Sequence, residues 1–223
     1  MADFSQLKCE LEKYFSMHLS ALNDAITSAA ITALWQDIAA RYNEPQRAHH
    51  TLKHIQQLFE QFDQIKDKLY EPHIIALALY YHDVTYDPRR SDNELKSAEY
   101  AVEALSHYLS AEQCQHIYAL IMMTATHQPH KLADEDKSSD AAYLLDMDLS
   151  ILGAPWSEYQ QYAQAVRYEY MHVAKEDYRT GRIVVLEKLL AHSTLYLTEY
   201  YYGRLEELAR DNIKREISFL RAS

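Results

Sequence analysis

The chain has 223 residues, and its 33 acidic and 22 basic side chains give a formal net charge of -11. This balance argues against a general binder of nucleic-acid polymers or anionic membrane surfaces, because both need a positive field. Its two cysteines are too few for a disulfide framework or a cysteine-rich zinc module, and they favour a reducing compartment. The charged N-terminus and the lack of a long apolar run lead us to expect a cytoplasmic protein.

The predicted elements are helices along the whole chain. Three glycines and five prolines are too few turn-forming residues for a protein of many strands. Apolar residues recur at helical spacing in the windows 117–125 and 183–190. In chain order the sequence predicts helices near 3–21, 26–42, 46–63, 72–83, 93–109, 111–126, 139–149, 156–173, 180–200 and 203–220. We therefore expect a single compact all-α domain over residues 1–223.

Two of these helices are predicted to begin with a capping box. Ser110-Ala-Glu-Gln113 and Ser157-Glu-Tyr-Gln160 both place a glutamine three residues after a serine. In that arrangement each side chain can hydrogen-bond the backbone N–H of the other residue.

The segment PHIIALALYYH, residues 72–82, is apolar nearly all round, which predicts a helix enclosed by other helices. His82 and Asp83 would then lie where this central helix ends. By contrast HKLADEDKSSD, residues 130–140, is polar and aperiodic, so we expect a loop there.

Several common chemistries are excluded by the sequence. The three glycines lie too far apart for a phosphate-binding or dinucleotide-binding loop, and no G-x-S-x-G elbow is present. In HHTLKH, Thr51 stands where a zinc protease would have its glutamate. A di-iron bundle needs Glu-x-x-His twice, and only Glu169 and His172 match.

The remaining donors of metal type are widely spaced. His50 and His54 are predicted to share one helical face, His82-Asp83 closes the apolar helix, and DMD at 146–148 adjoins another apolar run. Such groups at the margins of a core cost desolvation free energy unless they are paired or coordinated. One divalent cation held by two imidazoles and two carboxylates would satisfy them together.

The order of these donors resembles the HD superfamily of metal-dependent phosphohydrolases. The similarity extends to the blocks YNEPQRAHHTLKHI, YHDVTYDPRRSDNELKSA, LLDMDLSILG and VRYEY with YRTGRIVVLEKLL. These blocks cover most of residues 42–190, and they look like those of one bacterial branch of predicted HD phosphohydrolases. The resemblance implies an HD-like helical core at about 42–190, with further helices at both ends.

The resemblance also implies a metal site. Its ligands would be His50, His82, Asp83 and Asp148, with Asp146 less favoured. The ion would be Mn, Mg, Fe, Co, Ni or Zn. The branch tends to have Tyr and Asn on either side of its first His, where this chain has His49 and Thr51. A second metal bound through His54, His127 or His130 is left open.

Hydrolysis also needs a proton acceptor and groups that hold the substrate. Asp87 is the first candidate for the acceptor and Glu94 the second, although either carboxylate could cap the following helix instead. The related guanosine-polyphosphate hydrolases have an acidic pair after the doublet, and here only Asp87 keeps the acid. Arg47 and Arg167, both predicted to lie on helices, are expected to bind the phosphate or sugar.

The expected function is metal-dependent hydrolysis of a phosphate ester, a nucleotide or a nucleotide-like small molecule, and no nucleic-acid polymer or membrane is expected as a partner. Two alternatives stay open. One is a regulatory HD module that binds metal or nucleotide without turnover. The other is an oxygenase of HD type that uses two irons.

Overall fold

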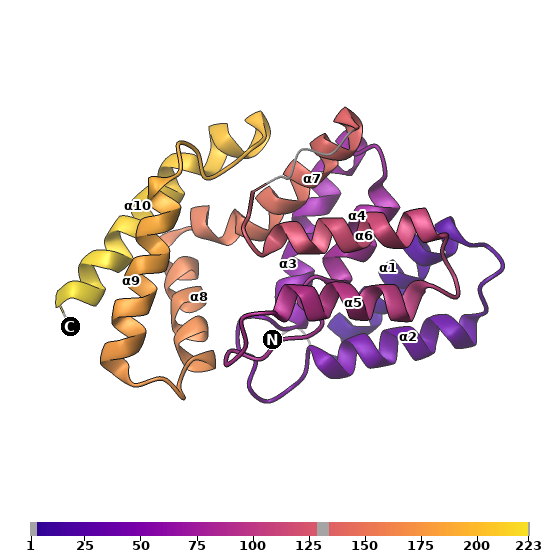
Figure 1. Cartoon of the computed structure of the whole chain (residues 1–223), viewed down its shortest axis with the longest axis horizontal. Helices are drawn as coiled ribbons and strands as arrows, with labels where there is room; N and C mark the ends of the chain where they lie inside the picture. Colours follow the sequence, from indigo (N-terminus) through magenta and orange to yellow (C-terminus); the bar gives the residue numbers. More distant parts are fainter. Residues whose placement is uncertain (1–3, 129–133, 223) are drawn as a thin grey trace. The chain divides into compact units, whose positions relative to one another are not determined.

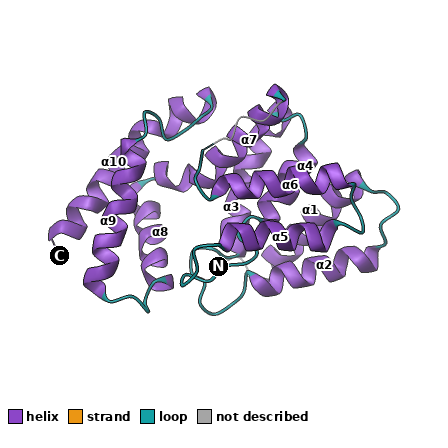
Figure 2. Ribbon diagram, viewed as in Figure 1, coloured by secondary structure: helices purple, strands orange, loops and turns teal. Residues whose placement is uncertain are grey.

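A computed structural model describes residues 4–128 and 134–222 of the chain. In this described part the regular elements are α-helices and two short 3-10 helices, without a strand, which confirms the predicted all-α class (Figure 2). The chain divides into two compact units, Met1–Leu144 and Leu145–Ser223. The division falls inside the predicted core of 42–190, and the assignment of one domain over 1–223 stays a prediction.

The first unit is built around one buried helix, α4 (Figure 1). Helices α1, α3, α5 and α6 pack against α4, and its residues from Ile74 to Tyr81 are all buried. This confirms the helix that the apolar segment predicts. The elements of the unit are α1 (Phe4–Leu22), α2 (Ser28–Arg41), α3 (Leu52–Ile65), η1 (Lys66–Lys68), α4 (Pro72–Tyr81), α5 (Asn93–Leu105), α6 (Ala111–Thr124) and most of α7 (Glu135–Asp148).

Helix α4 has clear start and stop points. Pro72 occupies the first turn, where its missing N–H costs no helical hydrogen bond. The helix ends at Tyr81, and His82 is its C-cap, with its backbone N–H donating to the carbonyl of Ala78. His82 and Asp83 therefore stand at the end of the central helix, as predicted.

Helix α3 begins later than predicted. Thr51 is its N-cap, because the Thr51 hydroxyl accepts from the backbone N–H of Lys53 at 3.3 Å. Arg47 and His50 consequently lie in the loop before the helix. The predictions that Arg47 lies on a helix and that His50 and His54 share a helical face were wrong.

Helix α7 begins earlier than predicted, at Glu135, so the expected loop is helical over residues 135–140. The carboxylate of Asp134 accepts from the backbone N–H groups of Asp136 and Lys137. Acidic residues in the first turn also suit the positive end of the helix dipole. Residues 130–133 of that predicted loop lie outside the described part of the chain.

Of the two predicted capping boxes, one is confirmed. Ser110 and Gln113 exchange both hydrogen bonds at the start of α6. Helix α8 instead begins at Trp156 after Pro155, which leaves Ser157 inside the helix without a capping bond.

The second unit contains the end of α7, η2 (Leu149–Gly153), α8 (Trp156–Glu169), α9 (Lys175–Ala191) and α10 (Glu199–Ala222). Helix α10 packs against η2 and α9. Gly153 permits the close approach to α10, since a Cβ atom there would lie 2.6 Å from Cβ of Leu205. Across both units, no described helix is long and apolar enough to cross a membrane.

Candidate metal centre

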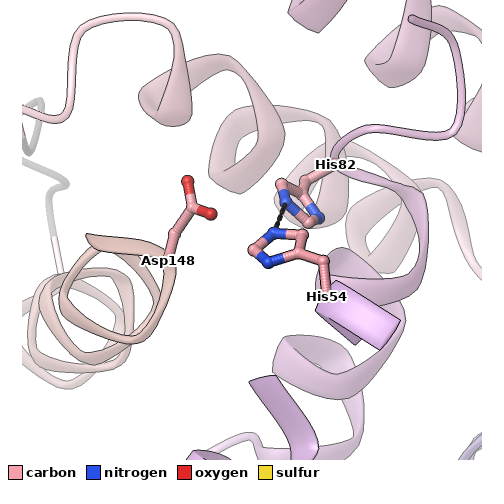
Figure 3. Close-up of side chains that lie close together, drawn as sticks. All are labelled: His54, His82 and Asp148. Atoms are coloured by element: carbon pink, nitrogen blue, oxygen red, sulfur yellow. Dashed lines mark hydrogen bonds between the residues drawn. The ribbon is translucent and has the colours of Figure 1, made fainter. Parts of the chain in front are cut away.

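Two buried histidines meet between α3 and α4. His54 lies in the first turn of α3, and His82 directly follows α4; their exposed fractions are 4% and 2%. Their Nε2 atoms are 3.3 Å apart (Figure 3). Buried nitrogens of two imidazoles in contact are a donor pair of the kind that binds transition metals.

The tautomer of His82 is fixed by its own helix. Its Nδ1 lies 2.8 Å from the carbonyl oxygen of Leu79. A carbonyl oxygen only accepts hydrogen bonds, so Nδ1 must donate its hydrogen to it. In the neutral ring the lone pair is then on Nε2, the atom that faces His54. A hydrogen bond from the second ring nitrogen to a backbone carbonyl is the usual support of a metal-bound histidine.

Asp83 adds a carboxylate to the same point. Its Oδ2 lies 3.0 Å from Nε2 of His82 and 3.9 Å from Nε2 of His50. The ring of His50 lies 4.1 Å from the ring of Tyr86, centroid to centroid. The predicted donors His50, His82 and Asp83 thus converge, although they come from separate segments of the chain.

The separations distinguish His54 from His50. Two atoms bound to one cation by bonds of about 2.0–2.2 Å, at angles of about 90–110°, lie about 3–3.5 Å apart. The distances from His82 to Asp83, 3.0 Å, and to His54, 3.3 Å, fall in this range. His50, at 3.9 Å from the carboxylate, lies further out. The contact of His54 with His82 therefore fits shared coordination, and His50 stays the imidazole ligand that the sequence resemblance predicts.

Asp148 is the last residue of α7 and is half-buried. It belongs to the second unit, because the division between the units follows Leu144. Helix α7 is continuous across this division, so Asp148 lies one helical turn beyond the end of the first unit. Its role as a ligand stays a prediction.

The two candidate proton acceptors lie in different settings. Asp87 is in the turn after the doublet, and its Oδ1 accepts from the backbone N–H of Arg89 at 2.9 Å. Its backbone N–H and carbonyl pair with the side-chain amide of Asn93. Glu94 is half-buried in the first turn of α5. Asp87 therefore shapes the turn, and a catalytic role for either acid stays a prediction.

The two predicted phosphate-binding arginines hold backbone carbonyls. Arg47 is buried and donates to the carbonyls of His50, Asp83 and Val84. Arg167 donates to the carbonyls of Tyr170 and Val173 just after α8. These contacts give both guanidinium groups a structural role, and binding of the phosphate or sugar by either arginine stays a prediction.

The histidines considered for a second metal lie in separate places. His54 is part of the pair described above. His127 follows α6 in a left-handed backbone conformation, with φ of 50°. His130 lies outside the described residues.

Asp146, the less favoured aspartate, is buried in the second unit. Its carboxylate accepts from the backbone N–H groups of Leu197 and Thr198 and from the hydroxyl of Thr198. Burial raises its pKa from 3.8 to about 6. Three donors at one carboxylate give Asp146 a structural role.

His54 entered the sequence analysis only as a candidate for a second metal. The signal that could have found it is Thr51, a strong N-cap type directly before the apolar periodicity of Leu52, Ile55 and Leu58. A helix starting at Leu52 separates His50 from His54 and leaves only His54 on the helix.

Comparison with known proteins adds no assignment. No family model matches the chain, and no curated protein matches it.

Proposed function

We propose that His54, His82 and Asp83 of the first unit bind one divalent cation, and that the chain hydrolyses a small phosphate ester of nucleotide type. The proposal combines the resemblance of the sequence motifs to the HD superfamily with the donor geometry in the first unit. It adds His54 to the predicted ligands His82 and Asp83, while His50 and Asp148 stay predictions of the sequence resemblance.

The observation that carries the proposal is the setting of Nε2 of His82. In the neutral ring this atom is an acceptor, because Nδ1–H donates to Leu79. The carboxylate of Asp83, 3.0 Å away, is also an acceptor. Two acceptors this close need a proton or a cation near both of them. A cation could also bind the lone pair of Nε2 of His54, which lies 3.3 Å from Nε2 of His82.

The donor set favours particular metals. Imidazole nitrogens suit Zn, Cu, Fe and Ni, whereas Mg prefers oxygen ligands. Two imidazoles with one or two carboxylates therefore favour Mn, Fe, Co, Ni or Zn over Mg. We expect Co and Ni to bind this site more tightly than Mn, in line with the general order of affinities.

Such a centre would supply the chemistry that an acidic chain otherwise lacks. A bound divalent cation makes a hydroxide available near neutral pH and polarises a phosphoryl oxygen. The formal net charge of -11 disfavours an anionic substrate elsewhere on the surface. We propose Asp87, or otherwise Glu94, as the acceptor of the released proton.

The test begins with metal-free protein and titrates Mn, Co, Ni, Zn and Mg by calorimetry. We expect one ion per chain, and we expect hydrolysis of nucleotides, dinucleotides or small phosphate esters that EDTA abolishes. His82→Ala should lose both binding and turnover, because it removes the nitrogen shared by the whole donor set.

A second histidine pair supplies the control. Nδ1 of His18 lies 3.0 Å from Nδ1 of His73, a contact like that of His54 with His82. Its ring neighbours include Phe59 and Phe62, and no carboxylate within hydrogen-bonding distance of either ring has been identified among the described residues. His73→Ala should keep metal binding and turnover.

Three outcomes would count against the proposal. Wild-type protein that binds none of the ions has no site of this kind. Turnover that survives both EDTA and His82→Ala would come from another site or a contaminant. Metal binding without turnover of any substrate would favour the regulatory module instead.

A further inference from the structure

Arg47 lies beside His50 and the His82-Asp83 turn, and its side chain makes four hydrogen bonds. Its side chain has an exposed fraction of 0%. Its Nε donates to Oε2 of Glu44 at 3.2 Å, Nη1 donates to the carbonyls of His50 and Asp83, and Nη2 donates to the carbonyl of Val84. These four contacts all come from one guanidinium group, which has five N–H donors in a fixed plane.

These contacts join the two segments that bear the ligands. The carbonyl of His50 belongs to the loop that leads into α3 and to His54. The carbonyls of Asp83 and Val84 belong to the turn that presents His82 and Asp83. The bond to the Asp83 carbonyl is the shortest of the set, at 2.7 Å. One rigid guanidinium therefore sets the spacing between segments that are far apart in sequence.

The far side of the same turn is held by α5. The hydroxyl of Ser97 accepts from the N–H of Thr85 and donates to its carbonyl, each at 3.1 Å. Asn93 makes the corresponding pair with the backbone of Asp87. Helix α5 thus fixes residues 85–87, while residues 82–84 are held by backbone bonds to α4 and by the contacts of Arg47 with the carbonyls of Asp83 and Val84.

We infer that Arg47 is a positioning residue of the metal centre, which fixes the distance between His54 and the His82-Asp83 turn. The inference rests on the proposed metal site. It replaces the expectation that Arg47 binds the substrate phosphate, because its donors point at carbonyl oxygens of the chain. Its effect is on metal affinity, through the geometry of the ligands.

The second unit offers a matched control. Arg210 has the same pattern of contacts: Nε donates to Glu206, and the two terminal nitrogens donate to the carbonyls of Leu190, His192 and Ser193. Both arginines thus bind one carboxylate and three carbonyls. The carbonyls bound by Arg210 belong to the segment before α10, which carries none of the proposed ligands.

The experiment compares Arg47→Lys with Arg210→Lys in the full chain. Lysine keeps the charge and loses the planar fork. We expect Arg47→Lys to weaken binding of Co(II) by about 10- to 100-fold, the usual effect of removing a partner outside the ligands. We also expect it to change the visible absorption of the Co(II) complex. Arg210→Lys should lower Tm of the metal-free protein and leave the Co(II) affinity within about twofold of wild type.

A second variant covers the case in which Arg47→Lys does not fold. Glu44→Gln keeps Arg47 and removes only the charge of its half-exposed partner, so we expect Co(II) binding to weaken by about two- to fivefold. Wild-type affinity and wild-type absorption in either Arg47→Lys or Glu44→Gln would overturn the inference. Wild-type protein that binds no Co(II) would overturn the proposed metal site itself, which separates the two failures.

Discussion

Asp83 in the first unit and Asp146 in the second both adjoin an apolar run, yet their carboxylates have opposite surroundings. Asp146 is fully buried, and its oxygens accept from two backbone N–H groups and one hydroxyl at 2.7–2.8 Å. Asp83 keeps an exposed fraction of 16%, and its Oδ2 faces the imidazoles of His82 and His50. The Asp146 carboxylate accepts hydrogen bonds from all three donors, and the Asp83 carboxylate faces ring nitrogens.

The difference separates a structural acid from a candidate ligand. A carboxylate surrounded by N–H and O–H groups has its acceptor capacity used within the fold. A carboxylate beside a histidine whose second nitrogen already donates to a carbonyl lies next to another acceptor, and a proton or a cation between them would resolve that conflict. The surroundings of the oxygen atoms, and not the burial of the residue, carry this information.

The largest expected effects are a loss of stability when Asp146 is replaced and a loss of metal binding when Asp83 is replaced. Asp146→Ala leaves the N–H groups of Leu197 and Thr198 without their acceptor, so we expect the free energy of unfolding to fall by about 3–5 kcal/mol. Its metal affinity, once folded, should match wild type. Asp83→Ala should lose metal binding and turnover, while the stability of the metal-free protein changes by about 1 kcal/mol or less.

Chemical denaturation of metal-free protein and calorimetric titration of each variant measure these two effects. The comparison fails if Asp146→Ala loses the metal while remaining folded, or if Asp83→Ala binds it like wild type.

Asp87 is intermediate between Asp146 and Asp83 in the surroundings of its carboxylate. One of its oxygens accepts from Arg89, and no hydrogen bond to the other oxygen has been identified from the described residues. Asp87→Asn keeps the shape and an acceptor, so stability and metal affinity should stay close to wild type. If Asp87 accepts the proton, turnover falls by about 10²- to 10⁴-fold, about 3–5 kcal/mol of barrier. Turnover near the wild-type rate would move the role to Glu94, with Glu94→Gln as the next variant.

The smallest expected effect concerns pH and the buried acid. Burial raises the pKa of Asp146 from 3.8 to about 6, so the folded state holds a proton that the unfolded state has lost between these pH values. Its contribution to stability is full below pH 3.8 and is lost as the pH rises through about 6; it amounts to about 3 kcal/mol at most. Asp146→Asn should remove this dependence.

The measurement is a difference between wild type and Asp146→Asn across that pH range, because a histidine opposes it. Burial and the neighbouring His73 lower the pKa of His18 from 6.5 to about 4, so its contribution is present above pH 6.5 and is lost as the pH falls. His18 is present in both proteins and cancels in the difference. A pH-independent difference would contradict the raised pKa of Asp146.

Much of the fold could be predicted from the sequence because its signals are local. The apolar run of 72–81 with Pro72 at its start predicted the central helix, and the His-Asp pair at its end followed from that. Ser110 and Gln113 predicted the start of α6 for the same reason. In each case the residues that interact lie within one or two helical turns.

The site could be predicted only in part, because its remaining determinants are not local. The donors that neutralise Asp146 are backbone groups at positions 197 and 198, and backbone N–H groups leave no mark in the sequence. The same holds for the carbonyls that bind Arg47, which the sequence could not indicate. His50 was preferred over His54 because the resemblance aligns it with the first ligand, and the unrecognised N-cap Thr51 hid the later start of α3.

The burial of α4 also determines how its backbone amides exchange hydrogen with solvent. Amides within Ile74–Tyr81 are covered by four helices, so their hydrogen exchange requires opening of the whole first unit. The turn after Tyr81 is held by the side chains of Arg47 and Ser97 and by the backbone bond from the N–H of Val84 to the carbonyl of Tyr81. If the proposed cation binds beside this turn, protection of the α4 amides should rise by the full free energy of binding.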